Sequence, residues 1–343
     1  MGRGGDATGV TISEVAAAAG VSRQTVSNVL KAPERVAPET AARVRRAIDE
    51  LGYRPNRAAQ NLRQRASRCI GLKMVSPAGV SDLFDRFLHA LTEAAGAAGY
   101  HVLLFGAAGD ELATSEDLIR TGTVDALVLV DVEVGDPRLP WFSRRGIPFV
   151  CFGRPRGQGR GRFWWADVDG AYGVACAVDH LVARGHRRVA YLGWPPGNGF
   201  GDDRRAGWQE AVRRHGLDAG DLVAASAEDV AAATAAARRL LGRPDPPTAF
   251  ACGSDTFAVG ARLAGGTGPD GWPNLEVVGF DDSPAVMLMS PPMSSVRQPL
   301  DEVARRVVGL LIDRLGGAET PREGVMLRPD LVIREWRGPE PVH

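Results

Sequence analysis

The chain has 343 residues and a mass of 36.4 kDa, roughly twice the size of one typical domain, so two or three domains are expected. Hydrophobic residues make up 44% of the chain and charged residues 24%, which excludes a wholly disordered or collagen-like protein. No apolar run approaches the roughly 18 residues of a membrane-spanning helix, and the first residues lack the apolar segment of a signal peptide. We therefore expect a cytoplasmic protein with no membrane partner.

The formal net charge is zero, but the charge is unevenly distributed. Residues 1–68 contain 12 Lys and Arg against 6 Asp and Glu, whereas the remaining 275 residues contain 29 against 35. This division predicts a small module that binds a polyanion, joined to an acidic body.

The first 52 residues predict three short helices. Thr11 and Glu14 fit a capping box, and Ser22 is suited to cap the second helix. Apolar residues at helical spacing give the expected inward faces: Ile12, Val15, Ala16 and Ala19, then Val26, Val29 and Leu30, then Ala41, Val44, Ile48 and Leu51. The short connection Ala19-Gly20-Val21 is typical of a helix-turn-helix unit, whose second helix lies in the major groove of DNA.

The pattern changes after Pro55, which interrupts the helical spacing. Residues 56–65 predict one more helix that is too short to be stable alone. From Cys69 onward apolar strands alternate with Ala-rich helices. The expected strands are Ile70–Val75, His101–Phe105, Ala126–Val130, Pro148–Phe152, Arg188–Leu192, Ala249–Cys252 and Glu276–Phe280, with helices at Phe84–Ala98, Tyr172–Arg184 and Arg204–His215. Such alternation predicts two doubly wound parallel-sheet subdomains with a cleft at their strand ends.

Several motifs occur in a recognisable order. Near the N-terminus they are Val10-Thr11-Ile12, Ala19-Gly20-Val21-Ser22-Arg23-Gln24-Thr25-Val26-Ser27 and Gly52-Tyr53-Arg54-Pro55-Asn56-Arg57-Ala58-Ala59. Later ones are His180-Leu181, Gly185-His186-Arg187-Arg188-Val189-Ala190, Val278-Gly279-Phe280-Asp281-Asp282 and Val296-Arg297-Gln298-Pro299. Together they closely resemble the lactose-repressor (LacI/GalR) family over about residues 10–335.

The resemblance implies a homodimeric transcription regulator with three parts. These are a small all-α helix-turn-helix headpiece at residues 10–55, a hinge helix at 56–68, and an effector-binding and dimerisation domain at 69–337 with the α/β fold of type I periplasmic binding proteins. The N-subdomain would comprise about residues 69–166 plus 298–328. The C-subdomain would comprise about residues 167–297 plus 329–337, so the chain would cross between them three times.

The same resemblance implies how the headpiece and hinge bind DNA. Arg23, Gln24 and Asn28 would face base edges, where arginine bonds guanine and the amides bond adenine. Phosphate contacts are implied for Thr11, Ser22, Ser27, Lys31, Arg35 and Thr40, whereas Arg43, Arg45 and Arg46 are expected on a solvated helix face. In the hinge, Leu62 would wedge between base steps of the minor groove, and Asn56, Arg57, Ala59 and Gln60 would contact backbone and base edges. The alternative is an ordinary linker whose leucine covers the neighbouring domain.

Ligands of doubly wound domains bind at the carboxyl ends of the strands. This rule selects Asp131, Gly153-Arg154, Trp194, Ser254-Asp255 and Asp281. Matching to the family selects Arg204, which we place at a helix start, Asp281 and Ser254, although asparagine is usual where this chain has serine. Carboxylates, an arginine and aromatic rings suit a sugar, and the rings would come from Phe84, Trp165, Trp194 and Trp164. For Arg204 and Asp281 the alternative is a structural ion pair, and Trp208 is expected in the core.

Catalytic and metal-binding motifs are missing from the sequence. There is no G-x-S-x-G, P-loop or G-x-G-x-x-G motif, and the four cysteines form no C-x-x-C pair. His180 and His186 match a structural connection in the family. We therefore expect no enzyme, no cofactor and no metal.

The function predicted from the sequence is a dimeric repressor of carbohydrate genes, released from a near-palindromic DNA operator by a sugar bound in the cleft. The nearer alternative is the same architecture with a nucleoside or purine corepressor that strengthens DNA binding. An enzyme with a basic regulatory arm would need a catalytic motif, and a purely architectural DNA binder would leave the cleft unexplained.

Overall fold

The computed structural model describes residues 10–53, 66–74, 82–106, 109–157, 163–267, 275–319 and 324–334. The chain divides into two compact units, Met1–Ser67 and Arg68–His343. Among the described residues, no helix combines the length and the apolar character that crossing a membrane requires.

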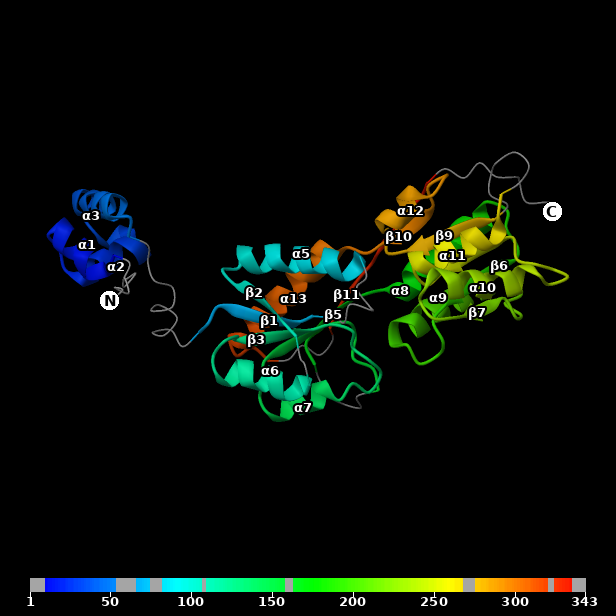
Figure 1. Ribbon diagram of the computed structural model, residues 1–343, viewed down its shortest axis with the longest axis horizontal. Helices are drawn as coiled ribbons and strands as arrows, with labels where there is room; N and C mark the ends of the chain where they lie inside the picture. Colours follow the sequence, from blue (N-terminus) through cyan, green and yellow to red (C-terminus); the bar gives the residue numbers. More distant parts are fainter. Residues whose placement is uncertain are drawn as a thin grey trace, which may run out of the picture. The chain divides into compact units, whose positions relative to one another are not determined.

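The first unit packs three helices around a small apolar core (Figure 1). They are α1 (Ile12–Ala19), α2 (Arg23–Lys31) and α3 (Pro38–Leu51), with a 3-10 turn, η1 (Pro33–Arg35), between the last two. The predicted capping box at Thr11 and Glu14 is present. Gly20 and Gly52 end α1 and α3 in the left-handed conformation, at φ of 62° and 63°.

Two residues expected to face this core are exposed instead. The side chains of Leu30 and Leu51 are 39% and 38% exposed. In α2 the buried residues are Val26 and Val29, and Leu30 lies one residue before the end of the helix. In α3 the inward position after Val44 is taken by Ala47, and Leu51 lies at the helix end.

The second unit contains two six-stranded sheets. The first has the order β11-β5-β4-β3-β1-β2. Its strands are β1 (Cys69–Lys73), β2 (His101–Phe105), β3 (Ala126–Leu129), β4 (Phe149–Phe152), β5 (Trp165–Val168) and β11 (Val325–Leu327). Helices α5 (Asp82–Ala97) and α13 (Leu300–Leu315) cover one face, and α6 (Glu111–Arg120) and α7 (Arg138–Arg144) cover the other (Figure 1).

The second sheet has the order β12-β10-β9-β8-β6-β7. Its strands are β6 (Val189–Gly193), β7 (Val223–Ala225), β8 (Ala249–Cys252), β9 (Glu276–Phe280), β10 (Ser294–Arg297) and β12 (Asp330–Val332). Its helices are α8 (Gly170–Ala183), α9 (Gly199–Arg214), α10 (Val230–Leu241), α11 (Asp255–Gly265) and the short α12 (Pro284–Leu288). All pairings are parallel except that of β12 with β10.

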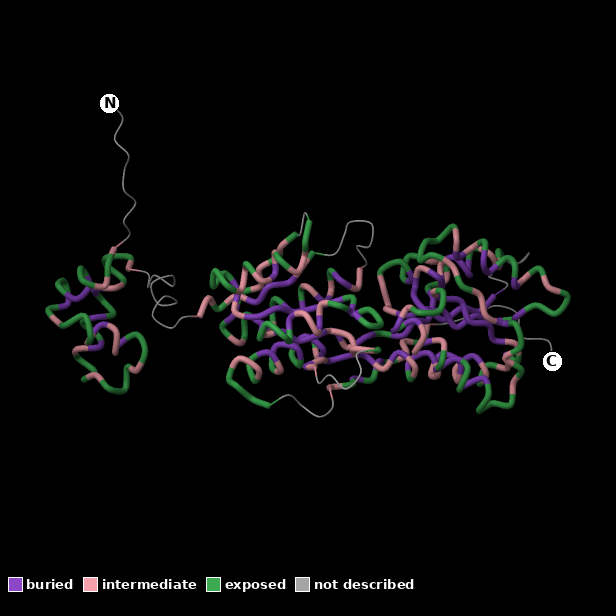
Figure 2. Tube along the Cα trace, turned by 90° about the horizontal axis from the view of Figure 1, so that it is seen from below, coloured by how far each residue is buried: buried purple, intermediate pink, exposed green. Residues whose placement is uncertain are grey.

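Apolar strands form the middle of each sheet because both faces are covered by helices. In β3, Ala126 and Val128 pack on the α5 side, while Leu127 and Leu129 pack on the α7 side. Figure 2 shows the resulting buried layers through both halves of the unit. Trp208 is fully buried, as expected, and its indole N–H donates to the Val189 carbonyl at 3.1 Å.

The chain passes between the two sheets after β5, after β10 and after β11. Strand β5 continues to Val168 before the first passage. The fold class predicted from the sequence is confirmed. The parallel strands of both sheets end toward the passage between them, which is where the strand-end rule places a ligand.

Candidate functional site

The three residues expected to read bases lie on α2 of the first unit. Arg23 and Gln24 are exposed and Asn28 is half-buried. The Gln24 side-chain N–H donates to Asn28 Oδ1 at 3.0 Å, so the two amides lie on one face of the helix, four residues apart. This face therefore presents a guanidinium beside a pair of amides.

The residues expected to contact phosphate lie in α2, at the N-caps of α1 and α2, in η1 and in α3. Thr11, Ser22, Lys31 and Arg35 are exposed, and Ser27 and Thr40 are half-buried. Ser22 also caps α2, because its hydroxyl accepts the Thr25 backbone N–H at 3.1 Å. Arg43 is exposed, as expected, and its Nε also donates to the Ala19 carbonyl at 2.8 Å, which ties α3 to the end of α1.

The structure does not test the predictions for the hinge. Asn56, Arg57, Ala59, Gln60 and Leu62 lie outside the described residues.

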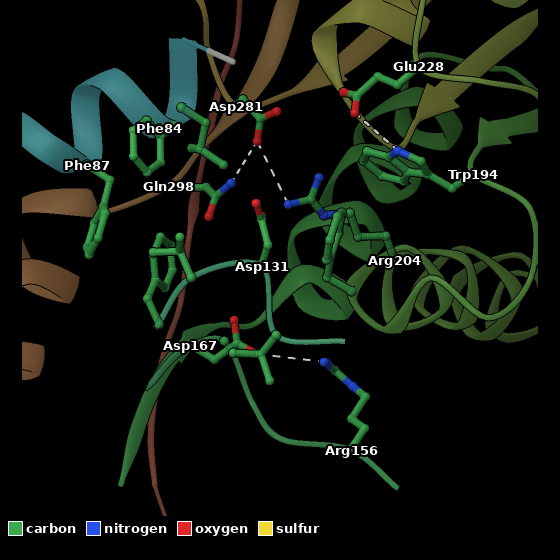
Figure 3. Close-up of a pocket in the computed structure, with 16 residues that line it drawn as sticks. Phe84, Phe87, Asp131, Arg156, Asp167, Trp194, Arg204, Glu228, Asp281 and Gln298 are labelled. Atoms are coloured by element: carbon green, nitrogen blue, oxygen red, sulfur yellow. Dashed lines mark hydrogen bonds and ion pairs between the residues drawn. The ribbon is translucent and has the colours of Figure 1, made fainter. Parts of the chain in front are cut away.

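The second unit contains a cavity of about 200 Å³ between its two sheets (Figure 3). Both subdomains contribute apolar and charged side chains to its wall. The lining residues are Leu83, Phe84, Phe87, Val130, Asp131, Val132, Phe152, Gly153, Arg156, Asp167, Trp194, Phe200, Arg204, Glu228, Asp281 and Gln298.

A polar network around Asp281 forms one wall of the cavity. Asp281 Oδ1 accepts an N–H of the Gln298 amide at 2.7 Å and lies 3.8 Å from Arg204 Nη2. Burial raises the pKa of Asp281 to about 7, against the lowering effect of Arg204. Asp281 also has a positive φ of 107°, a strained conformation of the kind that clusters at functional sites.

Arg204 is held in this network by its surroundings. Its Nη1 donates to the Gly253 carbonyl at 2.5 Å, and its guanidinium lies 3.7 Å from the centre of the Phe280 ring. Gly170 leaves the space that the arginine occupies, since a Cβ there would lie 2.9 Å from Arg204 Cγ. The arginine lies in the second turn of α9, which starts at Gly199, and not at a helix start as the sequence suggested.

Aromatic rings line both sides of the cavity. On one side Trp194 meets Phe200 edge to face, with ring centres 4.9 Å apart, and its indole N–H donates to Glu228 at 3.1 Å. On the other side the Phe87 and Phe152 ring centres are 4.5 Å apart. These faces are apolar surfaces between charged groups (Figure 3).

Two further carboxylates come from the first sheet. Asp131 follows β3 with a positive φ of 50°, and its carboxylate points toward the middle of the cavity (Figure 3). Asp167 accepts the Arg154 backbone N–H at 2.9 Å and lies 3.7 Å from Arg156. Burial raises the pKa of both carboxyls.

The two subdomains also contact each other directly beside the cavity. Arg86 of α5 donates to the backbone carbonyls of Asp281 and Asp282 at 2.7 and 3.2 Å. Arg154 and Arg156 both pair with Asp203 of α9, the former at 2.8 Å. Polar bonds at two separate points thus join the halves around the cavity.

Five of the predicted effector contacts line this cavity: Phe84, Asp131, Trp194, Arg204 and Asp281. Arg154 and Trp165 do not, because they line a separate cavity beside Asp203 and Gly324. Ser254 is only 1% exposed, and Trp164 is buried in the core.

Several lining residues were missed by the sequence analysis. Phe87 lies one helical turn after Phe84, a spacing that was visible in the sequence. Gln298 stands in one of the quoted motifs, directly after β10. Phe200, Glu228 and Arg156 lie outside the quoted motifs, and no sequence signal set them apart.

Among the described residues, no histidine or cysteine lines this cavity. His186 bonds Thr248 and Glu276, both at 2.9 Å, which is a structural arrangement. Cys151 and Cys252 are fully buried, and burial raises the pKa of both thiols. Over the described ranges, no cluster of His, Cys, Asp and Glu is suited to hold a metal ion.

Comparison with known proteins identifies both units. Residues 11–56 match the sequence model of bacterial regulatory proteins of the lacI family, and residues 178–335 match a periplasmic binding protein-like domain. The HTH-type transcriptional regulator CelR of Thermobifida fusca is 34% identical over 336 residues, covering 95% of this chain and 97% of CelR. AglR of Rhizobium meliloti, also an HTH-type transcriptional regulator, is 34% identical over 340 residues, covering 97% of this chain and 95% of AglR.

Solved structures agree with these matches. A CelR–cellobiose complex has a TM-score of 0.69 at 31% identity and covers 95% of this chain and 99% of its own. The lac repressor dimer bound to operator and the anti-inducer ONPF has a TM-score of 0.75 at 25% identity, and the match covers 95% of this chain and 98% of the lac repressor chain. The resemblance expected from the sequence motifs is confirmed, and the chain belongs to the lacI family of bacterial transcription regulators.

Proposed function

We propose that the protein is a homodimeric repressor that leaves its operator when a sugar occupies the cavity between the two subdomains. The observation that carries this proposal is the wall of that cavity, in which aromatic rings and carboxylates from both sheets surround one space (Figure 3). A repressor bound to chromosomal DNA works in the cytoplasm.

The cavity offers what a sugar ring needs. Apolar C–H faces would stack on Phe84 and Trp194, and paired hydroxyls would bond the planar groups of Asp281, Arg204 and Gln298. The relative CelR has been solved with cellobiose, which supports a saccharide in the equivalent cleft of this chain.

The helical unit would provide the operator contacts. Arg23, Gln24 and Asn28 share one face of α2, where they would reach base edges in the major groove. The lac repressor neighbour was solved as a dimer on its operator, which supports two such helices in successive major grooves of a near-palindromic site. The hinge residues Asn56, Arg57, Ala59, Gln60 and Leu62 would then meet in the minor groove.

Coupling between sugar and operator would come from the two polar contacts that join the subdomains. A ligand that touches both walls favours one relative orientation, and the DNA-bound dimer favours another. Such coupling is typically about 1–3 kcal/mol and acts equally in both directions, so operator DNA must weaken sugar binding by the same factor.

The test starts by selecting the operator from random duplexes with the full-length protein. Fluorescence anisotropy then measures operator affinity with cellobiose, maltose, lactose, adenine, guanine and cytidine added singly. We expect one or more saccharides to weaken binding five- to 150-fold. A nucleobase or nucleoside that strengthens binding would favour corepression instead, and the lack of any preferred duplex would refute a sequence-specific regulator.

The hinge has its own test. Leu62→Ala removes the proposed wedge and should weaken operator binding by over about 1 kcal/mol. Thermal unfolding of the effector domain and its saccharide affinity serve as controls and should match the wild type. Unchanged operator affinity would favour the ordinary-linker reading.

A further inference from the structure

The charged groups of the effector cavity are unequal in number. Four carboxylates (Asp131, Asp167, Glu228 and Asp281) face two guanidinium groups (Arg156 and Arg204), a formal charge of −2 when every group is ionised and −1 when Asp281 carries its proton. An anionic ligand would therefore depend on whether either arginine is available to it.

Arg204 is held within its own subdomain by three contacts of its guanidinium. One terminal nitrogen donates to the Gly253 carbonyl at 2.5 Å, and the other faces Asp281 at 3.8 Å. Its guanidinium also lies on the Phe280 ring. The buried Nε makes no hydrogen bond among the described residues, but it lies against Gly170, where a Cβ would be 3.3 Å away.

Arg156 is also held by its terminal nitrogens, while its buried Nε makes no hydrogen bond among the described residues. Its Nη2 pairs with Asp203 and lies 3.7 Å from Asp167, while its Nη1 donates to the Arg154 carbonyl at 3.1 Å. Both terminal nitrogens are thus taken by carboxylates and a carbonyl. A phosphate that bonds Nη2 would compete with the contact to Asp203, which joins the two subdomains.

Two of the four carboxylates have no cation of their own. Within the described part of the chain, neither Asp131 nor Glu228 forms an ion pair. Two cations act on Asp131 from a distance, and both are paired with other carboxylates: Arg138 with Asp136 at 2.7 Å and Glu111 at 3.2 Å, and Lys73 with Glu111 at 2.5 Å. Glu228 accepts only the neutral Trp194 N–H, at 3.1 Å. These oxygens are free to accept hydroxyl hydrogens and repel a second anion.

From this inventory we infer that the effector is an uncharged, unphosphorylated saccharide, and that the cavity rejects sugar phosphates. The inference rests on the proposed function and narrows its ligand class. It also places the signal in a reaction sequence. The effector must be supplied by glycoside hydrolysis or by uptake without phosphorylation, and a phosphoryl transfer to it would end the signal.

The experiment compares matched ligand pairs on the full-length protein. Isothermal titration calorimetry measures cellobiose, lactose, sucrose and trehalose against the 6-phosphate of each. We expect at least one neutral sugar to bind and its 6-phosphate to bind at least tenfold more weakly. Equal or tighter binding of the phosphate would overturn the charge inference alone, whereas binding of neither form by any pair would overturn the proposed sugar effector and this inference with it.

A charge variant tests the cause of the discrimination. Glu228→Gln keeps an acceptor for the Trp194 N–H but removes one negative charge. The penalty for the 6-phosphate, which is the factor by which it binds more weakly than the neutral sugar, should therefore fall at least threefold. Glu93→Gln makes the same change on an exposed position of α5 and should leave the penalty as in the wild type. A penalty that stays unchanged in Glu228→Gln, or falls equally in both variants, would refute the role of cavity charge.

Discussion

Gly207→Ala is expected to destabilise the effector domain through a single added methyl group. A Cβ at Gly207 would lie 2.1 Å from the Ala171 carbonyl oxygen and 2.5 Å from its Cα. Since ordinary contacts begin near 3.4 Å, α8 and α9 must separate by more than an ångström or shift along each other. Overpacking of this kind costs about 1–3 kcal/mol or more and outweighs the gain of about 1 kcal/mol in helix propensity.

The same change should also weaken effector binding, because Arg204 lies one turn earlier on α9. Gly309→Ala is the matched control: Gly309 is in α13, and a Cβ there would meet nothing within 4 Å. This control should gain up to about 1 kcal/mol from helix propensity alone. Differential scanning fluorimetry and saccharide calorimetry measure both effects. If Gly207→Ala melts at or above the wild-type temperature, the packing argument fails.

Three further outcomes follow from the site. Arg86→Ala removes the donor to the Asp281 and Asp282 carbonyls. The loss of operator affinity that the sugar causes, measured by fluorescence anisotropy, should become at least threefold smaller. A loss as large as in the wild type would contradict this. Because the folded pKa of Asp281 is raised to about 7, the native state keeps a proton that the unfolded chain releases near pH 4. The contribution of Asp281 to the free energy of unfolding therefore falls from pH 4 to 7. The free energy of unfolding, measured by urea titration at several pH values, should depend less on pH in Asp281→Asn than in the wild type. The same pH dependence in both proteins would count against the raised pKa. Lys31→Ala should weaken binding to all DNA duplexes equally and lower the slope of log affinity against log salt concentration by about 1. A loss of affinity for one DNA sequence alone would instead show that Lys31 reads bases.

The strands and caps were predictable because local chemistry fixes them. Strands β3 and β8 are short apolar runs buried on both faces, a pattern that helices of that length seldom show. The caps at Thr11 and Gly20 depend on a few neighbouring residues. In contrast, β7, β11 and β12 are three residues long and carry too little pattern to be recognised.

The cavity was only partly predictable, because the strand-end rule identifies the edge of the sheet where a ligand binds but not the direction in which each side chain there points. Asp131 and Asp281 follow their strands with side chains turned into the cavity. Arg154 follows β4 in the same way, but its guanidinium turns to Asp203 on the other subdomain. Trp165 lies on β5 between residues that face the opposite core, and the sequence did not show which of two adjacent tryptophans would face inward.

Asp281 connects the cavity to the opposite subdomain through two of its own groups. Its carboxylate meets Gln298 and Arg204 at the cavity wall, while its backbone carbonyl accepts from Arg86 of α5. A φ of 107° is strained for a residue with a Cβ and persists because both groups are held. A ligand that bonds the carboxylate acts on the same peptide that α5 holds. The differential contact that allostery requires is therefore available within one residue, with no chain of intermediates between the cavity and the subdomain contact.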